Sequence, residues 1–100
     1  MHDVQIEKPA STDIANIYLG LKAHARDPNA ADEWLDGVYR VIALLADFPL
    51  RCGKAPEDEF FDEDIRHRVE AWYRILFTVH DNTVHVLHIR GERQDTLRHR

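Results

Sequence analysis

The chain has 100 residues, of which 44% are hydrophobic and 31% are charged, and its formal net charge at pH 7 is −5. This length and composition are typical of one globular domain, expected over residues 1–100, and no apolar run approaches the roughly 18 residues that a membrane-spanning helix needs. The charge is uneven: residues 65–100 hold seven arginines and four acidic residues, whereas residues 1–64 hold six basic and fourteen acidic residues. A cationic segment within an acidic chain indicates an anionic partner.

The N-terminus and the cysteine content bear on the compartment. Residues 1–11 contain no basic segment followed by an apolar one, so no signal peptide is expected. A single cysteine, Cys52, cannot form an internal disulfide, which is typical of the reducing cytosol. We therefore expect a cytoplasmic protein in which Cys52 is an unreactive, buried side chain.

The first half of the chain predicts a short strand and two helices. Val4 and Ile6 alternate with polar residues, as in a strand, and Ser11 or Thr12 can cap a helix that follows. Asn29 can cap a second helix after a short turn, so the two helices should form an antiparallel hairpin. Apolar residues with helical spacing form the expected buried stripes: Ile14, Ile17, Tyr18, Leu21 and Ala25, then Ala31, Trp34, Leu35, Val38, Ile42 and Leu45.

Residues 49–64 form one long irregular stretch with a strongly acidic second half. Its acidic residues are Glu57, Asp58, Glu59, Asp62, Glu63 and Asp64. A solvated loop is the favoured interpretation. A metal site is the sharper alternative, but the stretch lacks the glycine turn and terminal glutamate of a calcium loop. We expect Phe60 and Phe61 to hold this loop onto the core, and we expect no metal or other cofactor.

From Ile65 onward the apolar period changes to two, which predicts three antiparallel strands. Turns are expected near residues 70–72 and at Asp81-Asn82. A three-residue first loop would place the arginines of the first two strands, Arg66, Arg68 and Arg74, on one face and the apolar residues on the other.

The predicted register of the last two strands leaves apolar side chains on the arginine face. On the core face, Val79, Phe77 and Ile75 would align with Val84, Val86 and His88. Leu76, Leu87 and Ile89 would then cluster on the outside, next to the arginines. Such a patch usually receives a partner, and the alternative is that the C-terminal residues 96–100 fold back over it.

Several segments of this sequence resemble the RelE/ParE superfamily of toxins from bacterial type II toxin–antitoxin systems, the plasmid stabilisation family. The resemblance spans roughly residues 3–95. It is carried by Leu45-x-x-x-Pro49, by Ile65-Arg66, by YRILFTV at 73–79, and by VHVLHIR at 84–90 with Arg93 following. It implies an α+β fold: an N-terminal strand, a helix hairpin, and a three-stranded antiparallel meander.

The resemblance also implies a partner. Toxins of this superfamily are neutralised by an antitoxin encoded beside them, whose C-terminal segment usually wraps the toxin. A peptide with apolar anchors and acidic residues would suit an apolar patch beside arginines. A homodimer or a toxin–antitoxin hetero-oligomer is a further possibility, and no membrane partner is expected.

Two activities occur in the superfamily, and the residues favour one of them. RelE-like members cleave messenger RNA on the ribosome with lysines, arginines and often a C-terminal tyrosine or histidine, whereas ParE-like members poison DNA gyrase. Arg74 matches the strand arginine of the family and Arg93 the arginine after the last strand, but residues 65–69 contain no lysine and the C-terminal tail contains no tyrosine. We therefore expect a ParE-like, non-enzymatic toxin, with a ribosome-dependent ribonuclease as the alternative and an inactive partner-binding relative as a second alternative.

The candidate site residues follow from these two readings. For a ribonuclease, the catalytic candidates are His67, Arg74 and Arg93. The candidates for partner or nucleic-acid binding are Arg66, Arg68, Arg74, Leu76, Leu87, Ile89, Arg90 and Arg93, because guanidinium groups match phosphate geometry. We expect His88 to be a core histidine, and His85 and His88 to point to opposite faces of one strand, so that they cannot share a metal.

Overall fold

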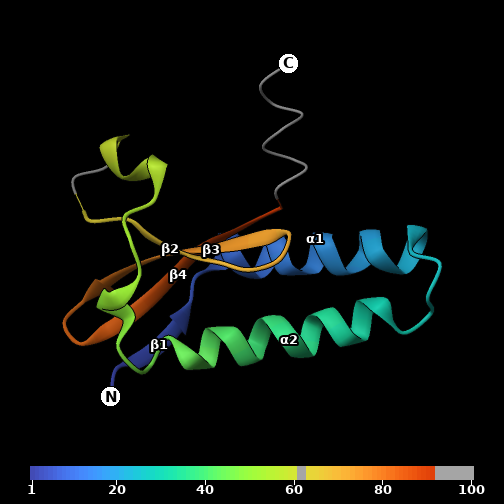
Figure 1. Cartoon of the computed structure of the whole chain (residues 1–100), viewed down its shortest axis with the longest axis horizontal. Helices are drawn as coiled ribbons and strands as arrows, with labels where there is room; N and C mark the ends of the chain where they lie inside the picture. The colour runs from blue at the N-terminus through green and yellow to red at the C-terminus, as the bar shows by residue number, and fades with distance from the viewer. Residues whose placement is uncertain (61–62, 92–100) are drawn as a thin grey trace.

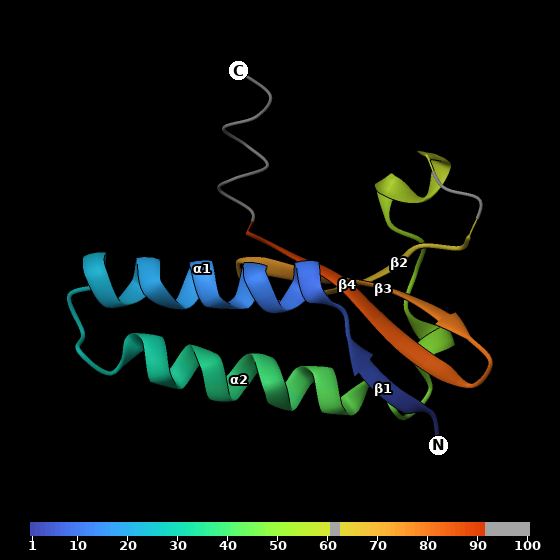
Figure 2. The same cartoon turned by 180° about the vertical axis from the view of Figure 1, so that it is seen from behind.

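The computed structural model of the chain describes residues 1–60 and 63–91. Its elements are β1 (Asp3–Ile6), α1 (Lys8–His24), α2 (Ala30–Leu44), the 3-10 helices η1 (Pro49–Arg51) and η2 (Pro56–Phe60), β2 (Arg66–Val69), β3 (Tyr73–His80) and β4 (Thr83–Gly91). The two helices lie side by side and cover one face of the sheet, while η1 and η2 lie at the end of the molecule opposite the turn between the helices (Figure 1; Figure 2 from behind). The predicted α+β class, with strand, helix hairpin and antiparallel meander, is confirmed. None of the helices in the described ranges is long and apolar enough to cross a membrane.

The first helix begins earlier than the sequence suggested. Glu7 is the N-cap of α1, and the Ser11 backbone N–H donates to the Glu7 carbonyl at 3.0 Å, so the predicted cap at Ser11 or Thr12 is wrong. The reason is Pro9, which fits the first turn of a helix because that position needs no N–H donor. Asn29 does occupy the N-cap position of α2, as predicted, but its side chain makes no capping hydrogen bond.

The sheet joins the two ends of the sequence. Its strand order is β1-β4-β3-β2, and β1 runs parallel to β4, with Val4 opposite Val84. The predicted turn between β3 and β4 is confirmed: Asp81 and Asn82 have φ angles of 50° and 61°, as the type I′ turn of a two-residue hairpin requires.

The β2–β3 register differs from the predicted one by one residue. Arg66 lies opposite Phe77 and Arg68 opposite Ile75, because Val69 pairs with Arg74 rather than with Tyr73. The Glu70 N–H donates to the Tyr73 carbonyl at 2.8 Å, so the hairpin closes around residues 71 and 72 rather than around three residues. Since cross-strand partners share a face, Arg66 and Arg68 lie on the helix side of the sheet, and Arg74 lies on the other. The prediction that these three arginines share one face is therefore wrong.

A β-bulge changes the faces of the end of β4. His88 lies opposite Leu76, but Val86 lies opposite Phe77, so Leu87 is an extra residue in the ladder. Every β4 residue after the bulge therefore points to the face opposite to the one that strict alternation predicts.

Three predictions about β4 are wrong for this reason. Ile89 faces Ile75 in the main core and is 2% exposed, whereas His88 lies on the outside with 43% of its side chain exposed. His85 lies opposite Thr78, on the same face as His88 rather than on the opposite one.

Two hydrophobic clusters lie on the two faces of the sheet. The main core, between helices and sheet, contains Ala10, Ile14, Trp34, Val38, Ile42, Leu45, Tyr73, Ile75, Phe77, Val84, Val86 and Ile89. A smaller cluster on the other face contains Ala55, Ile65 and Leu76, with Leu87 packed against it. Leu76 is only 3% exposed, so the predicted exposed patch of Leu76, Leu87 and Ile89 does not exist in this form.

The cover over Leu76 is the segment that leads into β2. Ala55 and Ile65, at its two ends, are both buried against Leu76. The alternative cover, residues 96–100, lies outside the described residues, as do Phe61 and the side chain of Phe60.

Candidate functional site

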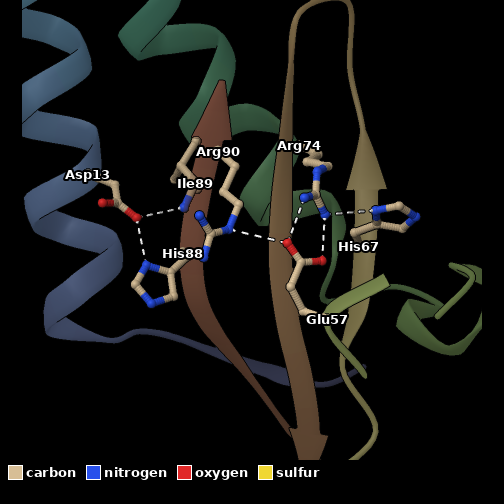
Figure 3. Close-up of polar contacts among 7 residues, drawn as sticks. All are labelled: Asp13, Glu57, His67, Arg74, His88, Ile89 and Arg90. Atoms are coloured by element: carbon tan, nitrogen blue, oxygen red, sulfur yellow. Dashed lines mark hydrogen bonds and ion pairs between the residues drawn. The ribbon is translucent and has the colours of Figure 1, made fainter. Parts of the chain in front are cut away.

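The outer face of the sheet, which is the face turned away from the helices, gathers charged and imidazole side chains from five elements. We call this group the outer-face cluster. Its members are Asp13 from α1, Glu57 from η2, His67 from β2, Arg74 from β3, and His88 and Arg90 from β4 (Figure 3).

Glu57 is the centre of the cluster. Its two carboxylate oxygens accept hydrogen bonds from the two terminal nitrogens of Arg74, at 2.9 and 2.6 Å. Both side chains are about four-fifths buried, with 18% of Arg74 and 20% of Glu57 exposed. This two-point geometry is the strongest common form of a carboxylate–guanidinium contact.

Arg90 contacts the same carboxylate through an ion pair alone. Its Nε atom lies 3.3 Å from Glu57 Oε2, which makes an ion pair. The contact is not a hydrogen bond, and this buried Nε has no acceptor in the part of the chain that the structure describes. Glu57 therefore neutralises charge at both arginines but accepts hydrogen bonds only from Arg74.

The charges of the cluster shift two protonation equilibria. The hydrogen bond from Arg74 lowers the pKa of Glu57, against the opposing effect of burial. Burial lowers the pKa of His67, the Arg74 cation lowers it further, and the Glu57 carboxylate partly offsets both. Glu57 is therefore anionic and His67 neutral at pH 7.

The Arg74 contact also assigns a tautomer to His67. The Nδ1 atom of His67 lies 3.4 Å from an Arg74 nitrogen. Because a guanidinium can only donate, Nδ1 is the acceptor and the proton of the neutral ring is on Nε2.

A second histidine, His88, carries its proton on the other ring nitrogen. Asp13 Oδ2 accepts from the Ile89 backbone N–H at 3.0 Å and lies 2.9 Å from His88 Nδ1. A carboxylate can only accept, so Nδ1 of His88 carries a proton, and the tautomer of a neutral ring would leave Nε2 unprotonated. Asp13 thereby fixes both the backbone at the end of β4 and the orientation of the imidazole.

The segment before β2 places Glu57 over the arginines. The Ala55 N–H donates to the Ile65 carbonyl at 2.8 Å, and the Ile65 N–H donates to Asp58 Oδ1 at 2.7 Å. These bonds flank Glu57 on both sides, and the burial of Ala55 and Ile65 adds an apolar anchor. The acidic stretch is therefore not uniformly solvated, contrary to the favoured interpretation.

Comparison with known proteins identifies the family. The family model described as "ParE toxin of type II toxin-antitoxin system, parDE" matches residues 4–96. The chain belongs to this family. No curated protein gives an accepted match.

Solved structures share the fold of the toxin at low sequence identity. A chain from a chromosomal ParDE toxin–antitoxin system of P. aeruginosa aligns with a TM-score of 0.74 and 18% identity, covering 91% of this chain and 96% of that one. A chain from the toxin–antitoxin complex RelBE2 of Mycobacterium tuberculosis aligns with a TM-score of 0.64 and 22% identity, covering 90% and 96%.

The other candidate residues of the toxin make local contacts. Arg66 donates to the carbonyl of Cys52 at 2.6 Å, and Arg68 forms an ion pair with Glu70 at 3.2 Å. Arg93 lies outside the described residues. Arg66 and Arg68 therefore hold the loops around β2, and of the predicted site residues the structure brings together His67, Arg74 and Arg90.

Sequence reasoning missed Glu57, His88 and Asp13. Glu57 is one of six acids in a short stretch, and no local signal distinguishes it. His88 was assigned to the core because the bulge at Leu87 has no glycine or proline to mark it. Asp13 ties α1 to β4, and no local sequence pattern marks that contact.

Two other features hold no comparable chemistry. An apolar hollow of about 400 Å³ lies beside the N-terminus and η1, lined by residues that include Met1, Phe48 and Leu50. Cys52 is partly buried and packs against the main core. Within residues 1–60 and 63–91, no three His, Cys, Asp or Glu side chains could together hold a metal ion.

Proposed function

We propose that this toxin acts on DNA gyrase and is neutralised by a cognate antitoxin. The observation that carries the choice of target is the Glu57 contact. A ribonuclease needs open cations to hold a phosphodiester, and here Glu57 engages both Arg74 and Arg90 on the outer face. The membership in the ParE family and the likeness to ParDE and RelBE complexes support the coarser part of the proposal, a type II toxin with an antitoxin partner.

A direct comparison of the two targets tests this proposal. The purified protein should inhibit supercoiling by gyrase at concentrations at which translating ribosomes keep their message intact. Addition of the antitoxin, identified as the product of a neighbouring reading frame that co-purifies with the toxin, should restore supercoiling. Intact supercoiling together with cleaved ribosome-bound message would reject gyrase as the target.

A second candidate function, ribosome-dependent cleavage of messenger RNA, is favoured by the two imidazoles of the outer-face cluster. His88 offers a free Nε2 that can accept a proton, and His67 carries a proton on Nε2 that can be donated. Arg74 and Arg90 lie between them on the same face (Figure 3). General acid–base catalysis needs this kind of complementary pair near the reacting phosphate.

A matched pair of variants tests the second candidate. His88→Ala should reduce message cleavage by about 10²-fold or more if His88 transfers a proton. His85→Ala is the control, because His85 also contacts a carboxylate, Glu7 at 3.0 Å, but lies farther from the arginines along β4. Equal effects of the two substitutions would rule out a catalytic role for His88.

A further inference from the structure

We propose that Arg74 and Arg90 form a binding site for a phosphate monoester, and that the Glu57 carboxylate occupies this site in the free protein. The ligand class is a terminal or free phosphate group rather than a backbone phosphodiester. This inference goes beyond the proposed function, because it holds whether the target is gyrase or ribosome-bound message.

The first argument is the geometry of the two guanidinium groups. Arg74 and Arg90 are direct cross-strand partners on β3 and β4, so their side chains leave the sheet side by side on one face. Both converge on a single oxygen, Glu57 Oε2, at 2.6 and 3.3 Å. The two paired strands therefore hold two guanidinium groups around the position of one oxygen atom, which is the arrangement that binds a multidentate anion.

The second argument is that a carboxylate fills this site incompletely. The Arg90 Nε is buried and has no hydrogen-bond acceptor among the described residues, although it lies 3.3 Å from a carboxylate oxygen. A buried donor without an acceptor costs about 1–3 kcal/mol. A phosphate monoester presents three terminal oxygens around one centre, so it can accept from Arg74 and still reach Arg90 with a favourable angle.

The third argument is that the Glu57 side chain can leave the site while the segment that carries it stays in place. η2 has five residues and is held near the sheet by two hydrogen bonds on either side of Glu57, from the Ala55 N–H to the Ile65 carbonyl and from the Ile65 N–H to the Asp58 carboxylate. Rotation of the Glu57 side chain alone would withdraw its carboxylate from both guanidinium groups without breaking these contacts.

The doubly charged form of the ligand explains how it can compete with a tethered carboxylate. A phosphate monoester carries a charge of about −1.5 to −2 at pH 7, whereas Glu57 carries −1. A phosphodiester carries −1, so it has no charge advantage over Glu57. We therefore expect the wild-type site to prefer monoesters.

The test uses two probes, inorganic phosphate and a short single-stranded oligonucleotide with a 5′-phosphate. The same oligonucleotide with a 5′-hydroxyl separates the terminal phosphate from the backbone. NMR detects binding as shifts of the Nε–H signals of Arg74 and Arg90. We expect saturable shifts in the wild-type protein with either phosphate probe and not with the 5′-hydroxyl oligonucleotide.

Three variants locate the site and identify its internal competitor. Glu57→Gln should bind the phosphate probes at least tenfold more tightly than wild type, and Arg90→Gln should lose binding. Glu59→Gln, in the same 3-10 helix, is the charge-matched control, because Glu59 is exposed and makes no ion pair in the described structure; it should bind like wild type. If Glu57→Gln does not fold, Glu57→Asp keeps the charge but shortens the side chain, and it should also bind more tightly.

Clear results would overturn the proposal. It is wrong if the wild-type arginine signals do not respond to phosphate, or if Glu57→Gln binds no better than Glu59→Gln. It is also wrong if both oligonucleotides bind equally, since the site would then bind the backbone phosphodiesters and not the terminal phosphate. Each of these results is independent of whether the protein inhibits gyrase.

Discussion

One carboxylate, Glu57, controls the electrostatics of the outer face. It is hydrogen-bonded to Arg74, ion-paired with Arg90, and close enough to His67 to raise the pKa of that imidazole. In a region about four-fifths buried, solvent screens these interactions less than on an open surface. A single substitution at Glu57 should therefore change the electrostatic environment of several charged and titratable side chains.

Glu57→Gln should lower the pKa of His67 further. Burial and the Arg74 cation already lower this pKa, and the Glu57 carboxylate is the one contribution that raises it. NMR titration of the imidazole signals measures the change, with Glu59→Gln as the control. A His67 pKa that rises in Glu57→Gln would contradict this arrangement of charges.

Glu57 should also make stability depend on acid pH. Its pKa is lowered in the folded protein, so its contribution is present above the unfolded-state pKa of about 4.3 and is lost as pH falls through the folded-state value. Glu57→Gln should cost about 1.5–3 kcal/mol at pH 7, as for hydrogen bonds to charged groups. Urea unfolding at pH 7 and below pH 4 measures this, and the difference between variant and wild type should shrink in acid. A difference that grows in acid would show that Glu57 is not stabilised as an anion.

At the scale of elements, the sequence predicts the fold well and the faces of the sheet poorly. Periodicity identifies both helices and all four strands because burial on one side imposes it. The faces depend on two details that periodicity does not record: the length of the β2–β3 loop and the bulge at Leu87. A shift of one residue in either place moves side chains such as Arg66 and His88 to the opposite face.

The candidate site was predictable only in part, for the same reason. Arg74 and Arg90 were identified because guanidinium groups match phosphate geometry, and Arg74 also because it matches the strand arginine of the family. Their pairing with Glu57 depends on a segment folding back over a sheet, which is a tertiary contact without a local sequence pattern. The same holds for Asp13, which contacts His88 across 75 residues of sequence.

The small hydrophobic cluster of Ala55, Ile65 and Leu76 should stabilise the segment that carries Glu57. Leu76→Ala should cost about 2–5 kcal/mol, because Leu76 is 3% exposed between Ala55 and Ile65. Hydrogen exchange should accelerate most at the Ala55 and Ile65 amides, which tie the Glu57 segment to the sheet. Leu19→Ala is the matched control, since Leu19 is 62% exposed and should change stability by less than about 0.5 kcal/mol. Equal costs for the two substitutions would mean that the segment does not cover Leu76 in solution.

At the scale of the whole molecule, the helix hairpin depends on strands that come much later in the chain. Ile14, Val38 and Ile42 are nearly fully buried and pack in one cluster with Phe77 and Val86 of the sheet. A fragment of residues 1–47 therefore exposes this apolar surface. It should show little helix by circular dichroism, since short helices are marginal without tertiary packing. A monomeric fragment with native-like helicity would show that the hairpin is an independent unit.

The charge of the whole molecule bears on how the toxin finds its target. The net charge is −5, and residues 1–64, which include the helix hairpin, hold fourteen acidic and six basic residues. Affinity for duplex DNA requires cations that release counterions, and Glu57 already engages Arg74 and Arg90. A toxin of this charge should recognise gyrase through protein contacts and not by binding DNA first.

We therefore predict that the isolated toxin has no measurable affinity for blunt duplex DNA at physiological salt, while it binds purified gyrase. Fluorescence anisotropy with labelled duplex, repeated from about 50 to 200 mM salt, measures the first part. The plot of log affinity against log salt should lack the steep negative slope of proteins that contact many phosphates, for which affinity falls by about 10³–10⁵ over this range. Pull-down of the gyrase subunits, with nuclease treatment to remove DNA, measures the second part. Tight, strongly salt-dependent duplex binding together with loss of gyrase capture after nuclease treatment would mean that the arginine-rich segment dominates the acidic remainder of the chain, and that DNA brings the toxin to its target.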